Sequence, residues 1–369
     1  MLRSLRAVGE SVAAPARGDA PDAWPLPAHF ERYWYASGTA ALAATLRAII
    51  EEAGKTQPTV LVPAYTCPDV LSAIEFAGAT AVAVDFEAER PWLSIDEVMQ
   101  RTDARVVGVI AINFQGIPEQ LARLRAFADQ ADIPLVYDHC QGFPLSDALM
   151  ALSDCAVFSF GRGKPAAALT GGAVIVNRER QPQVTLVAPQ VFVSAPPALK
   201  RHAYNLLIRP GVYGWPAKLP FLAIGQTVYH RLETLAALDE RGVAAVTTAI
   251  RQYPQNDQAP MLHAYREWLP KAWDLALQCG EHGQLLRLPV LLPDADTKRR
   301  MLRVLSAKGL GASPLYPTVL CELPGVPAGL IQDAGSPVAR DFAARLLTLP
   351  LHTDVTRRDI DAMRAVLSG

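Results

Sequence analysis

The chain has 369 residues, of which 50% are hydrophobic and 19% are charged, and its formal net charge is −1. This balance, without a basic block or an acidic tail, is not typical of chains that bind nucleic acid or a membrane surface, and we expect neither as a partner. The sequence contains no run of 18 apolar residues and no signal-peptide core. Its five cysteines and seven histidines show no metal-ligand spacing. We therefore expect a cytoplasmic globular protein without a bound metal.

Apolar strands alternate with helices through the first half of the chain. Residues 1–32 are irregular, and a helix is expected from Thr39, where apolar residues begin to recur at helical spacing. The expected strands cover residues 59–63, 81–84, 105–111, 133–137, 155–160 and 173–177. Strands that are apolar throughout and separated by helices indicate an α/β fold with a mostly parallel sheet covered on both faces.

The pattern changes after Arg178. It weakens up to residue 231, and a long helix is expected over residues 232–250. A smaller α/β unit follows, with strands at 285–292 and near 312–316, helices at 297–308 and 338–347, and a last helix from Thr356. Thr356 and Asp359 have the spacing of a capping box. We expect a large domain over residues 1–250, with an interface or linker region from about 185 to 250, and a small C-terminal domain over residues 251–369.

Candidate site residues lie where a parallel sheet places its ligands, at the carboxyl ends of strands. Asn113, Asp138 and Ser159 each stand at such an end. Ser37-Gly38-Thr39 precedes the first helix, and the free N–H groups of a helix N-terminus favour an anion. Taken alone, that segment is better explained by ordinary helix capping.

Lys164 stands in the turn Gly161-Arg162-Gly163-Lys164, directly after an apolar strand. A solvated loop lysine is the simplest interpretation of one such residue. The small residues around it and the upstream Asp138 favour instead a buried amine that takes part in chemistry.

In chain order, these segments together resemble the DegT/DnrJ/EryC1/StrS aminotransferases, pyridoxal phosphate (PLP) enzymes of the aspartate aminotransferase fold (fold type I). The resemblance covers nearly the whole chain. Each segment is weak alone, and their order is what makes the resemblance specific. The segments are Ser37-Gly38-Thr39-Ala40-Ala41-Leu42, Val62-Pro63-Ala64-Tyr65-Thr66, Gly78-Ala79-Thr80, the Asp138/Gln141 pair, Ser159 to Lys164, Thr170-Gly171-Gly172, Leu286-Arg287-Leu288-Pro289 and Tyr316-Pro317.

The resemblance implies the catalytic roles. Lys164 is expected to hold PLP as an internal Schiff base (internal aldimine) and to move protons during the reaction. This requires an amine that loses its proton near neutral pH, which partial burial beside a cationic cofactor can bring about. Asp138 is expected to keep the pyridine nitrogen protonated. The alternative for Asp138 is a carboxylate that caps the following turn.

The resemblance also implies the cofactor-binding residues. Gln141 matches the position that hydrogen-bonds the phenolic oxygen of PLP, and Cys140 matches a small residue beneath the ring. Ser159, with the backbone amides of Gly38 and Thr39, is expected to bind the phosphate. Arg162 either adds charge to the phosphate or faces solvent, and the sequence favours neither.

Three departures from the family pattern concern the ring and the substrate. Cys67 stands at a cofactor-binding position where the family places an aromatic ring, so Tyr65 or Phe114 is expected to compensate. Asn113 replaces a usual histidine, and with Tyr65 and Tyr316 it is a candidate substrate contact. The family's Gly-Tyr-Asn-Tyr-Arg segment, which lends an Asn to the partner subunit's phosphate site and helps to recognise nucleotide-linked sugars, is not found between residues 200 and 230. Candidate substitutes, each more simply explained as structural, are Asn205, Tyr213 and Tyr229.

The leading hypothesis is a PLP-dependent aminotransferase that moves an amino group from glutamate or glutamine to a keto or aldehyde acceptor, with a nucleotide-linked keto-sugar as a candidate. A second hypothesis keeps PLP but changes the reaction to decarboxylation, elimination or carbon–carbon bond formation. A third, a non-catalytic sensor, is disfavoured because Lys164 and Asp138 are both present. By analogy with fold type I, we expect a homodimer with shared active sites.

Overall fold

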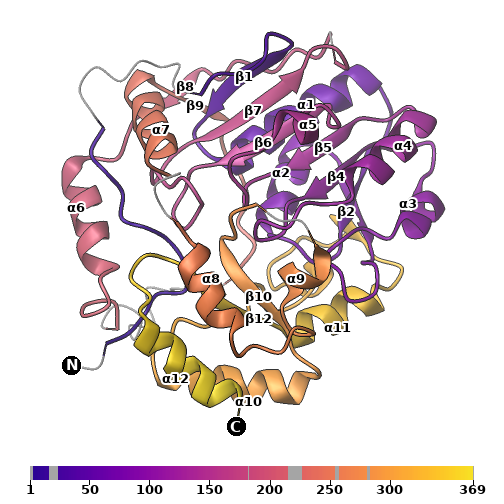
Figure 1. Ribbon diagram of the computed structural model, residues 1–369. Helices are drawn as coiled ribbons and strands as arrows, with labels where there is room; N and C mark the ends of the chain where they lie inside the picture. Colours follow the sequence, from indigo (N-terminus) through magenta and orange to yellow (C-terminus); the bar gives the residue numbers. More distant parts are fainter. Residues whose placement is uncertain are drawn as a thin grey trace.

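A ten-stranded sheet forms the centre of the larger part of the molecule (Figure 1). The computed structural model describes residues 3–15, 24–181, 183–214, 227–253, 257–280 and 283–368, and within them the strand order is β11-β3-β2-β4-β5-β6-β7-β1-β9-β8. These strands are β1 (Phe30–Tyr35), β2 (Thr59–Pro63), β3 (Thr80–Val84), β4 (Val106–Ile112), β5 (Leu135–Asp138), β6 (Cys155–Ser159), β7 (Gly172–Asn177), β8 (Val191–Val193), β9 (Ala236–Leu238) and β11 (Ile331–Gln332).

The sheet is mostly parallel, which confirms the predicted α/β fold. The six strands from β11 to β6 run parallel to one another, whereas β7 pairs antiparallel with both β6 and β1. Strand β1 lies partly in the segment that was expected to be irregular. It lengthens the sheet beyond β7 and leads directly into the first helix.

Helices cover both faces of this sheet. Helices α1 (Gly38–Ala53) and α2 (Asp69–Ala77) pack on one face, and α3 (Ile95–Arg101), α4 (Leu121–Ala131) and α7 (Glu240–Gln252) pack on the other. The short α5 (Asp147–Met150) precedes β6. The alternation of strand side chains divides the core: Val60 and Val62 of β2 join the first layer, and Leu61 joins the second.

The smaller unit is built on a two-stranded antiparallel sheet, β10 (Arg287–Leu291) with β12 (Leu346–Pro350). Its other elements are α8 (Ala259–Arg266), α9 (Leu275–Cys279), α10 (Ala295–Ala307), the 3-10 helix η4 (Leu320–Glu322), α11 (Pro337–Arg345) and α12 (Arg357–Leu367). The capping box at α12 is confirmed, because Thr356 and Asp359 each accept a hydrogen bond from the other's backbone amide. The second strand was predicted wrongly. It is β12, and around 312–316 Ser313 forms only an isolated bridge to Thr348.

The stretch between the two units also differs from the prediction. Helix α6 (Ala198–Leu207) lies where the pattern was weak, and it has no buried residue. The helix expected over residues 232–250 is wrong in its first part. Residues 236–238 form β9, and α7 begins after Asp239, whose side chain accepts a hydrogen bond from the Gly242 amide and so caps the helix.

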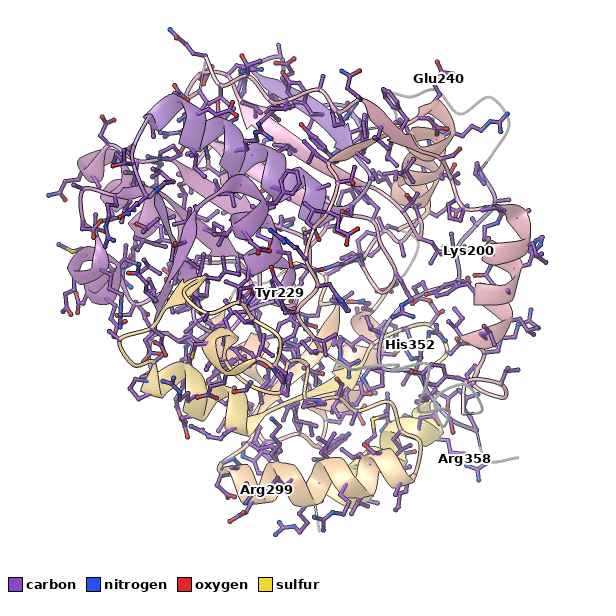
Figure 2. All side chains as sticks on the ribbon, turned by 180° about the vertical axis from the view of Figure 1, so that it is seen from behind. Lys200, Tyr229, Glu240, Arg299, His352 and Arg358 are labelled. Atoms are coloured by element: carbon purple, nitrogen blue, oxygen red, sulfur yellow. The ribbon has the colours of Figure 1, made fainter. Side chains whose placement is uncertain are left out.

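The N-terminal residues pack against the smaller unit. The Leu5 amide donates to the Gly309 carbonyl at 2.7 Å, and Arg6 is buried with its guanidinium against Asp354. A nitrogen of His352, Nε2, lies 3.0 Å from the Arg6 carbonyl. Figure 2 shows His352 inside the outline of the molecule, whereas Lys200 of α6 and Arg299 of α10 project from its edge.

Candidate functional site

The N-terminus of α1 is held open for a ligand by small residues. Ser37 caps the helix, because its hydroxyl accepts a hydrogen bond from the Ala40 amide. The start of β7 lies against this cap: a Cβ at Gly172 would come within 2.2 Å of the Ser37 carbonyl oxygen and 2.6 Å of the Gly38 nitrogen. Only glycine at position 172 allows this approach.

Gly38 faces the end of β6 just as closely. A Cβ at Gly38 would lie 2.7 Å from the Ser159 Cβ, 3.0 Å from the Cys140 sulfur and 3.1 Å from the Ser159 oxygen. The first turn of α1 and the Ser159 hydroxyl therefore border one small space. Free backbone N–H groups and a hydroxyl suit an anion such as a phosphate.

A pocket next to this turn collects most of the predicted site residues. It encloses about 430 Å³ of empty space, including its open mouth. Helices α1 and α2, the ends of strands β4, β5 and β6, and neighbouring loops contribute to it. The lining residues are Gly38, Thr39, Leu42, Cys67, Asp69, Val70, Ile112, Asp138, Cys140, Gln141, Ser159 and Lys164.

Lys164 is deeply placed in this pocket. Burial lowers the pKa of its ammonium, but the neighbouring Cys140, Cys67, Asp138 and Asp69 raise it, and the balance leaves the pKa above its ordinary value. Both thiols are uncharged near pH 7 because burial raises their own pKa, that of Cys67 to about 12. Near pH 7, the carboxylates of Asp138 and Asp69 are therefore the neighbouring charges that favour the protonated amine. The amine was expected to lose its proton beside a cationic cofactor, and that expectation stays a prediction.

Asp138 stands at the carboxyl end of β5, as expected. It is 8% exposed, and its Oδ1 accepts a hydrogen bond from the Cys140 amide at 3.0 Å. This bond is the local capping use of an aspartate that was the alternative interpretation. The Cys140 thiol also lies within hydrogen-bond reach of the Asp138 side chain. A carboxylate has about four lone-pair sites, so it can still accept a hydrogen bond from a group in the pocket. The local capping bond and a contact with a group in the pocket are therefore compatible.

Gln141 is oriented by a buried network. Its Oε1 accepts from the Gln115 side chain at 2.6 Å, and its Nε2 donates to the Tyr316 hydroxyl at 2.8 Å. Burial raises the pKa of Tyr316 well above its ordinary value, with Cys67 adding to the effect, so the hydroxyl stays protonated. Tyr316 thus belongs to the wall behind Gln141 and Cys67.

Like Tyr316, the predicted residues Tyr65, Phe114 and Asn113 do not line the pocket. Tyr65 is 1% exposed and packs against Phe114 and Phe342, with ring centroids 6.3 and 5.8 Å away, so neither Tyr65 nor Phe114 replaces the missing ring at Cys67. Asn113 turns away from the lysine: its Oδ1 accepts from the Gly116 amide at 2.8 Å and its Nδ2 donates to Tyr137. Asn113 borders a separate cavity beside His139.

The candidate substitutes in the 200–230 region have structural contacts. Asn205 holds the N-terminal segment through two 2.8 Å hydrogen bonds with the Val12 backbone. The Tyr229 hydroxyl donates to Glu75 on α2, and burial raises the pKa of Tyr213. The rest of that region, residues 215–226, lies outside the described residues.

The sequence analysis missed Asp69, the second carboxylate of the pocket. It begins α2 two residues after Cys67. Its position in the segment Tyr65-Thr66-Cys67-Pro68-Asp69, at the end of a strand, was the available signal.

The described part of the chain offers two further negative findings. It contains no group of three or more His, Cys, Asp or Glu side chains arranged to hold a metal ion. None of its helices is both long and apolar enough to cross a membrane.

Comparison with known proteins decides the family. The model of the DegT/DnrJ/EryC1/StrS aminotransferase family matches residues 34–368. The chain belongs to this family. Members of the DegT/DnrJ/EryC1/StrS family are PLP-dependent aminotransferases, and the chain is an enzyme of this type.

Known relatives are distant in sequence. The erythromycin biosynthesis sensory transduction protein EryC1 of Saccharopolyspora erythraea is 25% identical over 84% of this chain and 78% of its own length. The crystal structure of DesI in the presence of its TDP-sugar product has a TM-score of 0.65 at 22% identity, over 91% of this chain and 79% of that chain. NtdA of Bacillus subtilis, with the bound cofactor PMP, has a TM-score of 0.63 at 16% identity, over 92% of this chain and 73% of that chain.

Proposed function

We propose that the chain transfers an amino group from glutamate or glutamine to a keto or aldehyde acceptor, with Lys164 as the residue that carries PLP. The observation that carries this proposal is one pocket that combines a half-buried lysine, a strand-end carboxylate and a helix N-terminus with a facing hydroxyl. When bound, PLP would supply an electron sink for the substrate carbon that loses a proton.

The chemistry of the residues present fits this group. The first turn of α1 and the Ser159 hydroxyl form a cradle for a phosphate dianion, and Gly38 leaves no side chain in it. A carboxylate oxygen of Asp138 would accept a hydrogen bond from a protonated ring nitrogen. We propose these roles for Lys164, Asp138, Ser159 and the Gly38–Thr39 amides.

The other lining residues would orient the ring. Gln141 is fixed by Gln115 and Tyr316, so its amide cannot rotate freely, and this favours a defined contact with the phenolic oxygen. Cys67 and Cys140 would contact the two sides of the ring as small apolar groups, since neither thiol ionises near neutral pH. Tyr316 would act through Gln141 rather than on the substrate.

The test is a PLP titration followed by borohydride reduction and peptide mapping. The added mass should appear on the peptide that contains Lys164. Lys164→Ala should abolish both the adduct and the absorbance band, whereas Lys271→Ala, which changes an exposed lysine, should leave them unchanged. An adduct on another lysine would contradict the assignment.

The reaction type is tested by a single turnover. Addition of glutamate or glutamine alone to the PLP-loaded protein should release one 2-oxo acid per site, because the amino group stays with the cofactor. The alternative, another PLP reaction, predicts release of carbon dioxide or ammonia instead. DesI, whose structure was solved with a TDP-sugar product, supports a nucleotide-linked keto-sugar as the first acceptor to test.

We also propose a homodimer. Helix α6 has no buried residue, and Leu199 and Leu206 on it are 81% and 51% exposed. Phe192 on the edge strand β8 is 64% exposed. Large apolar side chains that are exposed in this way are typical of an interface. Sedimentation equilibrium tests this, and a monomer at micromolar concentration would contradict it. A cytoplasmic location stays an expectation that cell fractionation tests.

A further inference from the structure

Asp69 introduces a second carboxylate into the pocket that holds Lys164. It is the first residue of α2, its side chain is exposed, and it lines the pocket together with Cys67 and Val70. Among the described residues, no hydrogen bond or ion pair to this carboxylate is recorded. Asp69 is therefore a pocket carboxylate whose nearby cation in the described lining is Lys164.

The electrostatic effect of Asp69 reaches the centre of the site. Its charge is one of those that raise the pKa of Lys164, and after burial it is the largest cause that raises the pKa of Cys67. Such effects require that the carboxylate lies close to both groups and is not fully screened by water.

The charges of the described pocket lining do not balance once the cofactor is held. The ionisable carboxylates are Asp69 and Asp138, and the cation is Lys164. In the proposed enzyme, Asp138 faces the protonated ring nitrogen, and the Lys164 nitrogen is attached to the cofactor. Among the described lining residues, no cation other than Lys164 then remains to offset the charge of Asp69.

A purely structural role does not account for this position. A carboxylate in the first turn of a helix is stabilised by the macrodipole. Asp96 in the first turn of α3 has that role too, yet it is exposed and lines none of the described pockets. The difference between the two residues is the site that Asp69 faces.

We propose that Asp69 selects the amino donor by charge, so that glutamine is used in preference to glutamate; this rests on the proposed aminotransferase function. The two amino acids have nearly the same size and shape, but the glutamate side chain adds one negative charge. A pocket with an uncompensated carboxylate disfavours that charge in any pose within a few ångströms of Asp69. The neutral carboxamide of glutamine can also donate a hydrogen bond to Asp69.

The experiment compares the PLP-loaded wild-type protein with Asp69→Asn and with the matched control Asp96→Asn. Single-turnover release of 2-oxo acid gives kcat/KM for glutamine and for glutamate. In the wild type, glutamine should be preferred. Asp69→Asn should reduce the preference about tenfold, the factor that corresponds to one pKa unit of charge interaction. The change should appear in KM for glutamate, and it should shrink as ionic strength rises. Asp96→Asn should retain the wild-type ratio.

A binding measurement makes the inference independent of turnover. Succinamate and succinate differ by the same single charge, and each should change the absorbance of bound PLP when it occupies the pocket. The wild type should bind succinamate more tightly, and Asp69→Asn should remove the difference. Equal binding by the wild type, or an unchanged difference in Asp69→Asn, overturns the role of Asp69. If PLP attaches to Lys164 but neither amino acid releases a 2-oxo acid, the proposed function fails, while the succinate comparison still decides on Asp69.

Discussion

Gly38→Ala adds one methyl group where α1 meets the end of β6, and we expect it to weaken PLP binding. The new Cβ would lie 2.7 Å from the Ser159 Cβ, far inside the optimum of about 3.5–4.0 Å for two carbon atoms. Elsewhere in a helix the same change gains about 1 kcal/mol, because alanine is the better helix former. At position 38 the steric conflict outweighs this gain, so we expect the substitution to be unfavourable.

The expected magnitude follows from what must move. Ser159 belongs to β6, which is paired on both sides in the sheet, so the end of α1 is the part that shifts. Overpacking of this kind costs about 1–3 kcal/mol of folding free energy. A shift that breaks one charge-assisted hydrogen bond to the phosphate costs about 1.5–3 kcal/mol of binding free energy. The Kd for PLP should therefore rise by about 10- to 100-fold.

The assay is an absorbance titration with PLP, combined with urea unfolding of the ligand-free protein. Gly211→Ala is the control, because Gly211 is exposed and an added Cβ there would have no neighbour within 4 Å. A Gly38→Ala protein that binds PLP within about threefold of the wild type and unfolds at the same urea concentration would refute the packing argument, since a factor of three is below one hydrogen bond.

Three further predictions concern single side chains. Ser159→Ala should raise the Kd for PLP by about tenfold, because one charge-assisted hydrogen bond is lost. It should not move the urea midpoint, because no protein hydrogen bond to the Ser159 hydroxyl is recorded among the described residues. An unchanged Kd would mean that Ser159 does not bind the phosphate. Burial lowers the pKa of His139 to about 3, below the usual value of about 6.5. The unfolded chain then binds the extra proton, so stability is lost as pH falls below about 6.5, by about 1.4 kcal/mol per pH unit. Urea unfolding at pH 7 and pH 5 should show this loss in the wild type and a smaller one in His139→Gln; equal losses would contradict it. Burial raises the pKa of Cys67 to about 12, so iodoacetamide at pH 7.5 should alkylate it about 1,000-fold more slowly than a free thiol. Peptide mapping checks this, and rapid labelling in the folded protein would contradict it.

The sequence by itself determined the chemistry of the site. Lys164, Asp138, Ser159 and the Gly38–Thr39 turn are each marked locally, by a strand that ends or a helix that begins. In a parallel sheet, strand ends share one edge, so residues far apart in the chain are expected to meet there. The pocket does bring these residues together. The α/β class followed from the same alternation of apolar strands and helices.

Only the tertiary structure decided which neighbours complete the site. Tyr65 and Asn113 also follow buried strands, but the packing of Tyr65 on Phe114 and the bond of Asn113 to the Gly116 amide turn both away from the lysine. A strand-end position says that a residue is near the edge, and it does not say to which side its chain turns. Asp69 shows the converse, since the orientation of α2 brings its carboxylate into the pocket.

The same limit applies to the protonation of the lysine. From the sequence, the amine was expected to lose its proton near neutral pH through partial burial beside a cationic cofactor. In the folded chain, the acidic groups gathered around Lys164 come from two separate segments, residues 67–69 and 138–140, and they oppose the effect of burial on its pKa. The sum of charges at one point depends on distances between segments, and these exist only once the chain has folded.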